Sequence, residues 1–315
     1  MKSFKKYKTV LSEIGYYIYA LCEIIGEDRI PFYIGKGKHD RCLQHLDAED
    51  DDTRSKKIKS LLKEDRLGID IIRHGIKTDR EAKIIEATCI DLLGVGNLTN
   101  KVRGSGVDMG RVTLEEIHNL RSGKTVKIKS LIKHDRLGID IIRHGIKTDR
   151  EAKIIEATCI DLLGVGNLTN KVRGSGVDMG RVTLEEIHSL CSGKTVKIKA
   201  KHAGIAFLLN STYKSGMSEV ALFESTRGVW HNPRRDESIK YAYATYGGLI
   251  KEVYEIHSWV PAGTQQYFER ELIDEDIVNR WEFIGKKASQ EVRELYIGKI
   301  LEKDRSFGSP FVYVG

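Results

Sequence analysis

One block of the chain occurs twice in tandem, and this duplication most limits how the chain can fold. Segment 57–126 recurs as 127–196, and the two copies differ only at Leu62/Ile132, Glu64/His134, Asn119/Ser189 and Arg121/Cys191. Solenoid repeats tend to have shorter units, and they need at least three copies to bury a continuous core. The block is therefore a duplicated part of a domain, and either copy could complete the segment that precedes it.

Each copy contains the same order of predicted elements. In the first copy, "SKKIKSLLKEDR" has the apolar spacing of a helix, and "IDIIRHGI" after Gly68 is strand-like. Thr78 and Glu81 form a capping box that begins the helix "DREAKIIEATCIDLL", which Gly94 can end. The loop "GVGNLTNKVRGSG" and a short helical piece, "TLEEIHNL", complete the copy.

The composition is that of a soluble, folded chain long enough for two or three domains, with 40% hydrophobic and 31% charged residues in 315. The apolar runs are shorter than a bilayer span, and "MKSFKKYKTV" lacks the apolar region of a secretory signal. We therefore expect an intracellular, cytoplasmic protein without a membrane partner, nucleoid-associated if bacterial. The five cysteines form no CxxC pair, which argues against a disulfide framework and a zinc site. A net charge of +7 and a pI near 9.0 favour a polyanionic partner.

Residues 16–46, "YYIYALCEIIGEDRIPFYIGKGKHDRCLQHL", combine two strand-like runs with several polar side chains. The two runs can pair as a hairpin, with Tyr17 and Tyr19 on one face. Asp40 can cap a helix "RCLQHL", on which Arg41 and His45 are four residues apart and share a face. Tyrosine, lysine, arginine and histidine side chains are thus expected to converge beside one sheet edge.

These residues resemble the GIY-YIG nuclease family. The YIG half is literal at residues 33–35, and the GIY half reads Tyr17-Ile18-Tyr19, with tyrosine where the family usually has glycine. The run "YIGKGK" followed by arginine and histidine is most similar to the branch of animal LEM-domain nucleases and their bacterial and phage relatives. The resemblance covers residues 13–105, in which two tyrosines, an arginine, a histidine, a helical glutamate and an asparagine occur in family order.

The resemblance implies hydrolysis of phosphodiester bonds with one divalent cation, Mg²⁺ or Mn²⁺. Tyr19 would act as or orient the general base, with Lys36 nearby to favour its phenolate, and Tyr33 would bond the phosphate or the water. Arg41 would stabilise charge that develops on the phosphoryl oxygens, and His45 would hold the hydrogen-bond network or assist proton transfer. Asn100 would bind phosphate or brace the site. The alternative for the tyrosines is packing within the hairpin, and for Arg41 and His45 a solvated helix face.

The metal ligand should be a carboxylate on the second helix of the copy. Glu81 is already used by the capping box, whereas Glu86 lies on the apolar stripe of that helix, where an unpaired carboxylate is costly. Glu86 is therefore the predicted ligand, and a salt bridge to Lys83 or Arg80 is the alternative.

The duplication offers this carboxylate twice, as Glu86 and Glu156, and the asparagine twice, as Asn100 and Asn170. Closing a loop of roughly 80 residues instead of roughly 10 costs about 1.8 kcal/mol more. We therefore expect the first copy to complete the site through Glu86, with Glu156 as the alternative. The spare copy would pack as an extra subdomain or exchange with another chain, which would give a homo-oligomer.

The predicted fold class is α+β, in four regions along the chain. Residues 1–12 form a basic tail, disordered in part; 13–105 form the nuclease domain, a small antiparallel sheet flanked by helices; 106–196 contain a linker and the second α/β copy. Residues 197–315 contain all three tryptophans and short alternating runs such as "SEVALFES", "GLIKEVYEIHSW", "RWEFIG" and "PFVYVG". With a helix in "SQEVRELYIGKIL", they indicate a β-rich, barrel-like C-terminal domain.

The C-terminal region loosely resembles small β-barrel modules of the PUA/EVE type, which grip a nucleobase. The resemblance implies that it reads nucleic acid, with aromatic side chains that stack on bases and arginines that reach phosphates. The candidates are Trp230, Tyr246 and Trp259 for stacking, with Arg234 and Arg235 for phosphates. The alternative is that the tryptophans fill the core of a small barrel.

The sequence as a whole favours a metal-dependent endonuclease that acts on DNA, with a C-terminal targeting domain. The alternative is a nucleic-acid-binding protein, for RNA or modified DNA, whose nuclease domain is inactive.

Overall fold

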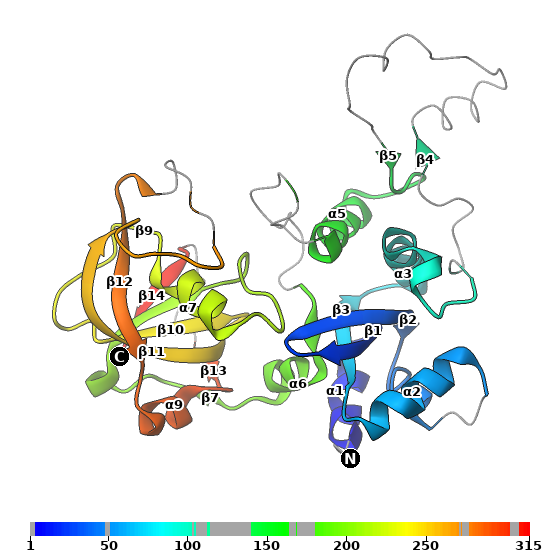
Figure 1. Cartoon of the computed structure of the whole chain (residues 1–315), viewed down its shortest axis with the longest axis horizontal. Helices are drawn as coiled ribbons and strands as arrows, with labels where there is room; N and C mark the ends of the chain where they lie inside the picture. Colours follow the sequence, from blue (N-terminus) through cyan, green and yellow to red (C-terminus); the bar gives the residue numbers. More distant parts are fainter. Residues whose placement is uncertain are drawn as a thin grey trace, which may run out of the picture. The chain divides into compact units, whose positions relative to one another are not determined.

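The computed structural model describes residues 4–47, 51–102, 104, 112–113, 140–163, 168, 180–270, 272, 277–302 and 309–315. The chain divides into two compact units, one formed by 1–25 with 29–181 and the other by 26–28 with 182–315 (Figure 1). None of the helices in these described ranges is long and apolar enough to cross a membrane.

The N-terminal segment is helical from Phe4 onward, within the region expected to be a basic tail disordered in part, and residues 1–3 of that region lie outside the described residues. A 3₁₀ turn, η1 (Phe4–Tyr7), leads into helix α1 (Lys8–Glu13). Tyr7, Val10 and Leu11 are buried, with at most 1% of each residue exposed. The basic residues between them obscured an amphipathic pattern, and burial of the apolar side chains orders the segment.

The first unit is built on the sheet order β2-β1-β3, in which β1 is Tyr16–Ile25, β2 is Asp28–Gly37 and β3 is Leu67–Ile76. A two-residue turn joins β1 to β2, so the predicted hairpin is confirmed. Strand β3 runs antiparallel to β1, and Tyr19 is opposite Ile71. The other face of β1 carries Ile18 and Ala20 into a core cluster with helix α3.

Two helices of the first copy lie close to their predicted positions. Helix α2 (Thr53–Lys63) begins at an Asp52 cap, whose carboxylate accepts a hydrogen bond from Ser55 N. Helix α3 (Asp79–Leu93) has the predicted capping box, and it ends at Gly94 with φ +81°. A short 3₁₀ turn, η3 (Val95–Asn97), follows.

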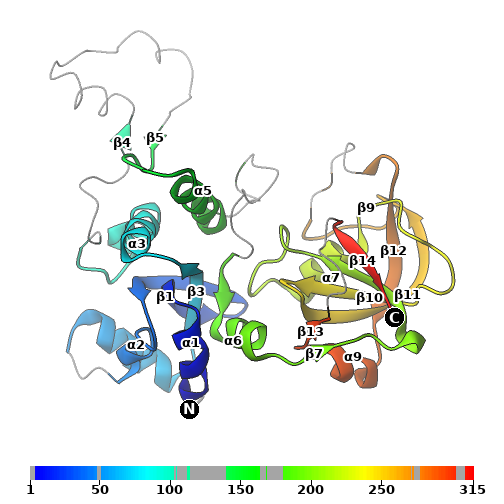
Figure 2. The same cartoon turned by 180° about the vertical axis from the view of Figure 1, so that it is seen from behind.

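The second copy folds differently from the first despite its sequence. Among the described residues of its strand-like run, 140–146, the strand is β5 (Asp140–Ile141), which pairs with β4 (Val112–Thr113). Its long helix, α5 (Asp149–Leu163), lies beside α3 in both views (Figures 1 and 2). Its last helical piece is α6 (Leu184–Ser192), whereas the equivalent "TLEEIHNL" of the first copy lies outside the described residues.

The second unit contains one larger sheet, with the strand order β14-β8-β10-β11-β12-β9. Among the described residues this sheet does not close into a barrel. Its principal strands are β8 (Gly204–Leu208), β9 (Trp230–His231), β10 (Tyr241–Tyr246), β11 (Leu249–Pro261), β12 (Arg280–Lys287) and β14 (Phe311–Val314). The shorter elements are β6 (Val182–Thr183), β7 (Thr195–Val196), η5 (Ala200–His202), α9 (Gln290–Tyr296) and β13 (Ile300–Leu301).

One expected strand of the second unit is a helix. The run "SEVALFES" lies in α7 (Glu219–Arg227), which begins where the Ser218 hydroxyl accepts a hydrogen bond from Ala221 N. The serine cap, the acidic first turn and the good helix formers Ala221 and Leu222 outweigh the imperfect alternation of the run.

Candidate active site

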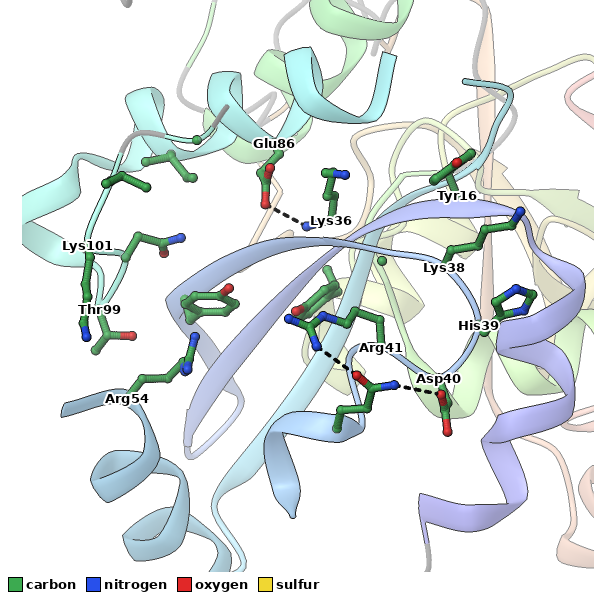
Figure 3. A pocket seen from close by; sticks show the side chains of 18 of the residues that line it. Tyr16, Lys36, Lys38, His39, Asp40, Arg41, Arg54, Glu86, Thr99 and Lys101 are labelled. Carbon is green, nitrogen blue, oxygen red and sulfur yellow. Dashed lines mark hydrogen bonds between the residues drawn. The ribbon is translucent and has the colours of Figure 1, made fainter. Parts of the chain in front are cut away.

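A cavity of about 800 Å³ in the first unit gathers most of the side chains singled out in the sequence (Figure 3). Its walls come from β1, β2, the turn after β2, α3 and the segment after η3. The lining includes Tyr19, Tyr33, Lys36, Arg41, Glu86 and Asn100. Residues almost 70 positions apart therefore face one hollow, as the family order of the residues implied.

Tyr19 crosses the backbone of β2, and glycine makes this possible. A Cβ atom at Gly35 would lie 2.6 Å from both Cζ and Oη of Tyr19, which is closer than real Cβ contacts allow. A Cβ atom at Gly37 would likewise lie 2.5 Å from Cζ of Tyr17. The glycines of "YIGKG" are thus required because two tyrosine rings of β1 cover them.

The hydroxyl of Tyr19 is hydrogen-bonded to His45, at 2.6 Å from Nε2. Burial raises the pKa of Tyr19 well above its usual value, and the neighbouring Tyr33 and Cys42 raise it further. Burial also lowers the pKa of His45 to about 4, and the charges of Arg54 and Arg41 lower it further. At neutral pH the pair is therefore uncharged, and an unprotonated Nε2 can accept a hydrogen bond from the tyrosine hydroxyl.

Lys36 does not take the position expected for it. Its ammonium group donates to Asp79 Oδ1 at 2.5 Å, in the first turn of α3. The nearby carboxylate of Asp79 attracts the ammonium more strongly than the neutral hydroxyl, and the Tyr19 hydroxyl is hydrogen-bonded to His45 instead.

The segment that carries Arg41 is a turn, which corrects the predicted helix "RCLQHL". Only Gln44–Leu46 form a 3₁₀ turn, η2, and Asp40 accepts from the Gln44 side chain at 3.3 Å instead of capping a helix. Arg41 is exposed and His45 is buried, so the two do not share a face.

Tyr17 holds this turn in place. Its hydroxyl donates to His39 O at 2.6 Å and accepts from Cys42 N at 3.2 Å. These bonds satisfy backbone groups that a helix would have used, and they direct Arg41 toward the cavity. The Arg41 guanidinium donates to Gln44 Oε1 at 2.8 Å (Figure 3).

Glu86 faces the cavity from α3 and accepts a hydrogen bond from Lys36 N at 2.9 Å (Figure 3). Burial raises the pKa of this carboxyl group. Asn100 brackets β2, because its Oδ1 accepts from Ile34 N and its Nδ2 donates to Ile34 O. Asn100 thus braces the backbone of β2. Both groups of its side-chain amide, which could otherwise bind phosphate, are already engaged in these two hydrogen bonds.

The counterparts from the second copy are elsewhere. Glu156 lies on α5 and is exposed, and Asn170 lies outside the described residues. Of the two duplicated glutamates, it is Glu86 of the first copy that lines the cavity.

The structure adds basic residues that the sequence did not single out, namely Lys38, Arg54 and Lys101. The Arg54 guanidinium lies over the Tyr33 ring, 5.0 Å from its centroid. Arg54 is the second residue of α2, whereas the apolar pattern indicated a helix from Ser55. The acidic run that ends at the Asp52 cap was the signal for the earlier start.

In the second unit, three of the candidate side chains are used in packing. Tyr246 is only 1% exposed and packs on Tyr213, with ring centroids 4.5 Å apart, so burial excludes it from stacking on a base. Trp230 stacks on Phe207 at 4.5 Å, and its indole N–H donates to Thr226 O. Trp259 meets Phe283 edge to face. These contacts favour the alternative that aromatic side chains fill the core.

The two arginine candidates of the second unit are exposed. Arg234 lies over the ring of Tyr313, 4.7 Å from its centroid, and Arg235 lies over the ring of Trp281 at 3.8 Å. Both guanidinium groups remain accessible while their stacking partners orient them.

Comparison with known proteins supports a nuclease. Residues 29–120 match the LEM-3-like GIY-YIG domain. This match supports assignment of the region to the GIY-YIG nuclease family, which implies a nuclease and suggests nucleic acid as its substrate. The matched range includes Tyr33, Arg41 and Glu86, while Tyr19 precedes it. Searches of curated proteins and of solved structures gave no significant match.

GIY-YIG nucleases generally use divalent metal ions, and the donor set in the cavity is compatible with one. In the part of the chain that the structure describes, no three His, Cys, Asp or Glu side chains gather to hold an ion by themselves. Mg²⁺ commonly uses one or two carboxylates, several waters and substrate phosphate oxygens. The Glu86 carboxylate, which lines an open cavity, suits this kind of binding.

Proposed function

We propose that the protein is a metal-dependent endonuclease that hydrolyses phosphodiester bonds in DNA. The observation that carries the proposal is the hydrogen bond between Tyr19 and His45 at the wall of a cavity that also contains Glu86 and Arg41. A proton acceptor, a carboxylate and a cationic side chain are the groups that hydrolysis of a phosphodiester requires.

In the proposed mechanism Tyr19 receives a proton from the attacking water and passes its own to His45. The water O–H bond breaks as the proton reaches the Tyr19 oxygen, and the hydroxyl proton of Tyr19 moves to Nε2 of His45. The water oxygen forms a new bond to phosphorus while the P–O bond to the leaving oxygen of the DNA strand breaks, and that oxygen takes a proton from solvent. Both groups are uncharged at neutral pH, because burial raises the pKa of Tyr19 and lowers that of His45. The Tyr19 hydroxyl would thus accept the proton of the water, and neither Tyr19 nor His45 would have to remain charged in its buried position between reactions.

The basic side chains would hold the phosphate and stabilise its developing charge. Arg41 is exposed to the cavity, and its guanidinium can donate two parallel hydrogen bonds to phosphoryl oxygens. Arg54 and Lys101 lie at the same wall and would contact neighbouring phosphates (Figure 3). Asn100 would act indirectly, by fixing the backbone of β2 at Ile34.

Glu86 is the proposed ligand of the cation, Mg²⁺ or Mn²⁺. When bound, the cation would polarise a phosphoryl oxygen and neutralise charge on the substrate. The hydrogen bond from Lys36 N to one carboxylate oxygen orients Glu86. The second unit would assist by contacting the nucleic-acid backbone through the exposed Arg234 and Arg235, whose charges suit phosphates.

A plasmid-nicking assay with increasing Mg²⁺ or Mn²⁺ tests the proposal, and the duplication supplies its control. Glu86→Gln should reduce nicking by at least about 100-fold at every metal concentration, because it removes the charged ligand. Glu156→Gln changes the same residue of the same helical sequence and should nick DNA like the wild type. Absence of metal-dependent nicking by the wild type, with DNA binding retained, would instead support a binding protein with an inactive domain.

A further inference from the structure

The two copies of the duplicated segment contact each other through matching residues. Arg73 forms an ion pair with Asp161, and its Nε donates to Thr158 Oγ1 at 3.0 Å. Arg143, at the same position of the second copy, pairs with Asp91 at 2.5 Å, and its Nε donates to Thr88 Oγ1 at 2.8 Å. In both ion pairs, at most 4% of either side chain is exposed.

The same exchange occurs where α3 and α5 begin. Arg80 Nε lies 3.3 Å from Glu151 Oε1, and Arg150 Nε lies 3.2 Å from Glu81 Oε1. Farther along, each helix contributes two adjacent isoleucines to the contact. A void of about 10 Å³ is lined by Glu81, Ile84, Ile85 and by their equivalents Glu151, Ile154 and Ile155.

Reciprocal contact of this kind is the property of an isologous interface, in which the same patch occurs on both partners. Two copies of nearly identical sequence need not contact each other in this reciprocal way. The strand of the first copy is built into the sheet as β3, whereas the equivalent described residues of the second copy, 140–146, contain the two-residue β5. The patch nevertheless makes the same contacts from both sides, which indicates that the patch itself is self-complementary.

We propose that this patch, formed by α3 with Arg73, is a self-association surface that the second copy occupies within the same chain. The surface has one fitting occupant, a second copy of itself, because each buried arginine requires the aspartate and threonine of an equivalent helix. The second copy therefore acts as a built-in partner, and it keeps the full chain monomeric by covering α3.

Occupation from within the chain is favoured by proximity. Segments of one chain can meet at effective concentrations on the order of 1 mM, which exceeds the micromolar concentration of a second chain. Weakening α5 alone should release α3 to pair with α3 of another chain. In that dimer, Arg73 of each chain would meet Asp91 of the other, so the buried ion pairs would form twice.

The test compares molar masses of three full-length proteins by light scattering during size exclusion, at about 1 to 100 μM, below the effective concentration within the chain. The wild type should have the mass of one chain, 35.6 kDa. The α5 variant, Ile155→Asp with Asp161→Arg, should have twice this mass. The α3/α5 variant, which adds Asp91→Arg, should return to one chain, because Arg73 would then face an arginine across the dimer.

Circular dichroism of each protein separates loss of pairing from loss of folding. If Ile155→Asp prevents folding, Asp161→Arg alone serves as the second variant, since it reverses one charge of a buried pair. A folded α5 variant that stays monomeric at all concentrations would overturn the proposal. A dimeric wild type would overturn it as well, because α3 would then not be covered from within the chain.

Discussion

The hydroxyl oxygen of Tyr19 lies 2.6 Å from Nε2 of His45, and this bond connects β1 to the turn that carries Arg41. The rings of Tyr19 and His45 both pack near Tyr33, with centroids 6.2 Å and 5.2 Å from that ring. The proposed proton acceptor is thus held by an aromatic cluster as well as by its hydrogen bond.

Replacing Tyr19 by phenylalanine keeps the ring over Gly35 and removes only the hydroxyl. We expect Tyr19→Phe to lower the rate of plasmid nicking by about 10²- to 10⁴-fold, which is the usual contribution of a positioned proton-transfer group. The free energy of unfolding should fall by about 1–3 kcal/mol, because Nε2 of His45 loses its partner in a buried position. Single-turnover nicking and urea unfolding measure the two effects. A rate within threefold of the wild type would contradict the proposed role.

The depressed pKa of His45 predicts a pH dependence of stability. Burial lowers its pKa from 6.5 in the unfolded chain to about 4, so between these values the unfolded chain binds more protons. Stability should therefore be lost as the pH falls from about 6.5 to about 4, by about 3 kcal/mol from this residue. Urea unfolding across this range, with His45→Gln as the control, isolates the contribution. An equally steep loss in His45→Gln would assign the effect to other groups.

Gly35 should be intolerant of even one added methyl group. In Gly35→Ala the new Cβ would lie 2.6 Å from the Tyr19 ring, so the ring or β2 must shift. We expect a loss of stability of about 1–3 kcal/mol, typical of overpacking, and a loss of nicking of about 100-fold from the misplaced hydroxyl. Gly96→Ala is the matched control, because no atom lies within 4 Å of a Cβ there. Similar behaviour of the two variants would show that the close approach is unimportant.

The elements that local chemistry determines could be predicted from the sequence. Helix α3 begins at the Thr78 capping box and ends at Gly94, as the residue types indicate. The hairpin and the gathering of Glu86 near the tyrosines follow equally from spacing and family order. Each of these features depends on residues close in sequence or on an order that the family shares.

The parts that tertiary contacts determine could not be predicted. The segment "IDIIRHGI" lies in the ten-residue strand β3 in the first copy, yet the described part of its second copy, 140–146, has strand structure at the two residues of β5. Strand β1 already pairs with β2 on one side and with β3 on the other, so the equivalent residues of the second copy cannot pair with β1 as β3 does. Tertiary contacts also determine the turn around Arg41, because the hydroxyl of Tyr17, on strand β1, is hydrogen-bonded to the backbone of the turn at His39 and Cys42.

Deletion of the second copy should leave the nuclease activity intact. The deletion of 127–196 joins Val126 to Lys197. In the full chain Lys197 follows Val196, the equivalent of Val126, so the new junction has the same local sequence. All the proposed catalytic residues precede the deleted segment. The rate of nicking per chain should therefore stay within about twofold of the wild type, which corresponds to a change of about 0.5 kcal/mol in the activation free energy. A loss of more than tenfold in a folded protein would mean that the second copy contributes to the site.

The near-identity of the copies provides a strict control for this deletion. Removing 57–126 instead gives a chain that differs from the first deletion at only four positions. Two of these, Leu62 and Glu64, are among the described residues, and neither lines the cavity. In that chain Glu156 and Asn170 would follow the turn at the distance that Glu86 and Asn100 now have, so they should complete the site. Equal nicking by the two deletions, each lost on replacing its remaining glutamate by glutamine, would show that position in the chain selects the ligand. Inactivity of the second deletion alone would show that one of the four differing residues matters, and exchanging them one at a time would identify it.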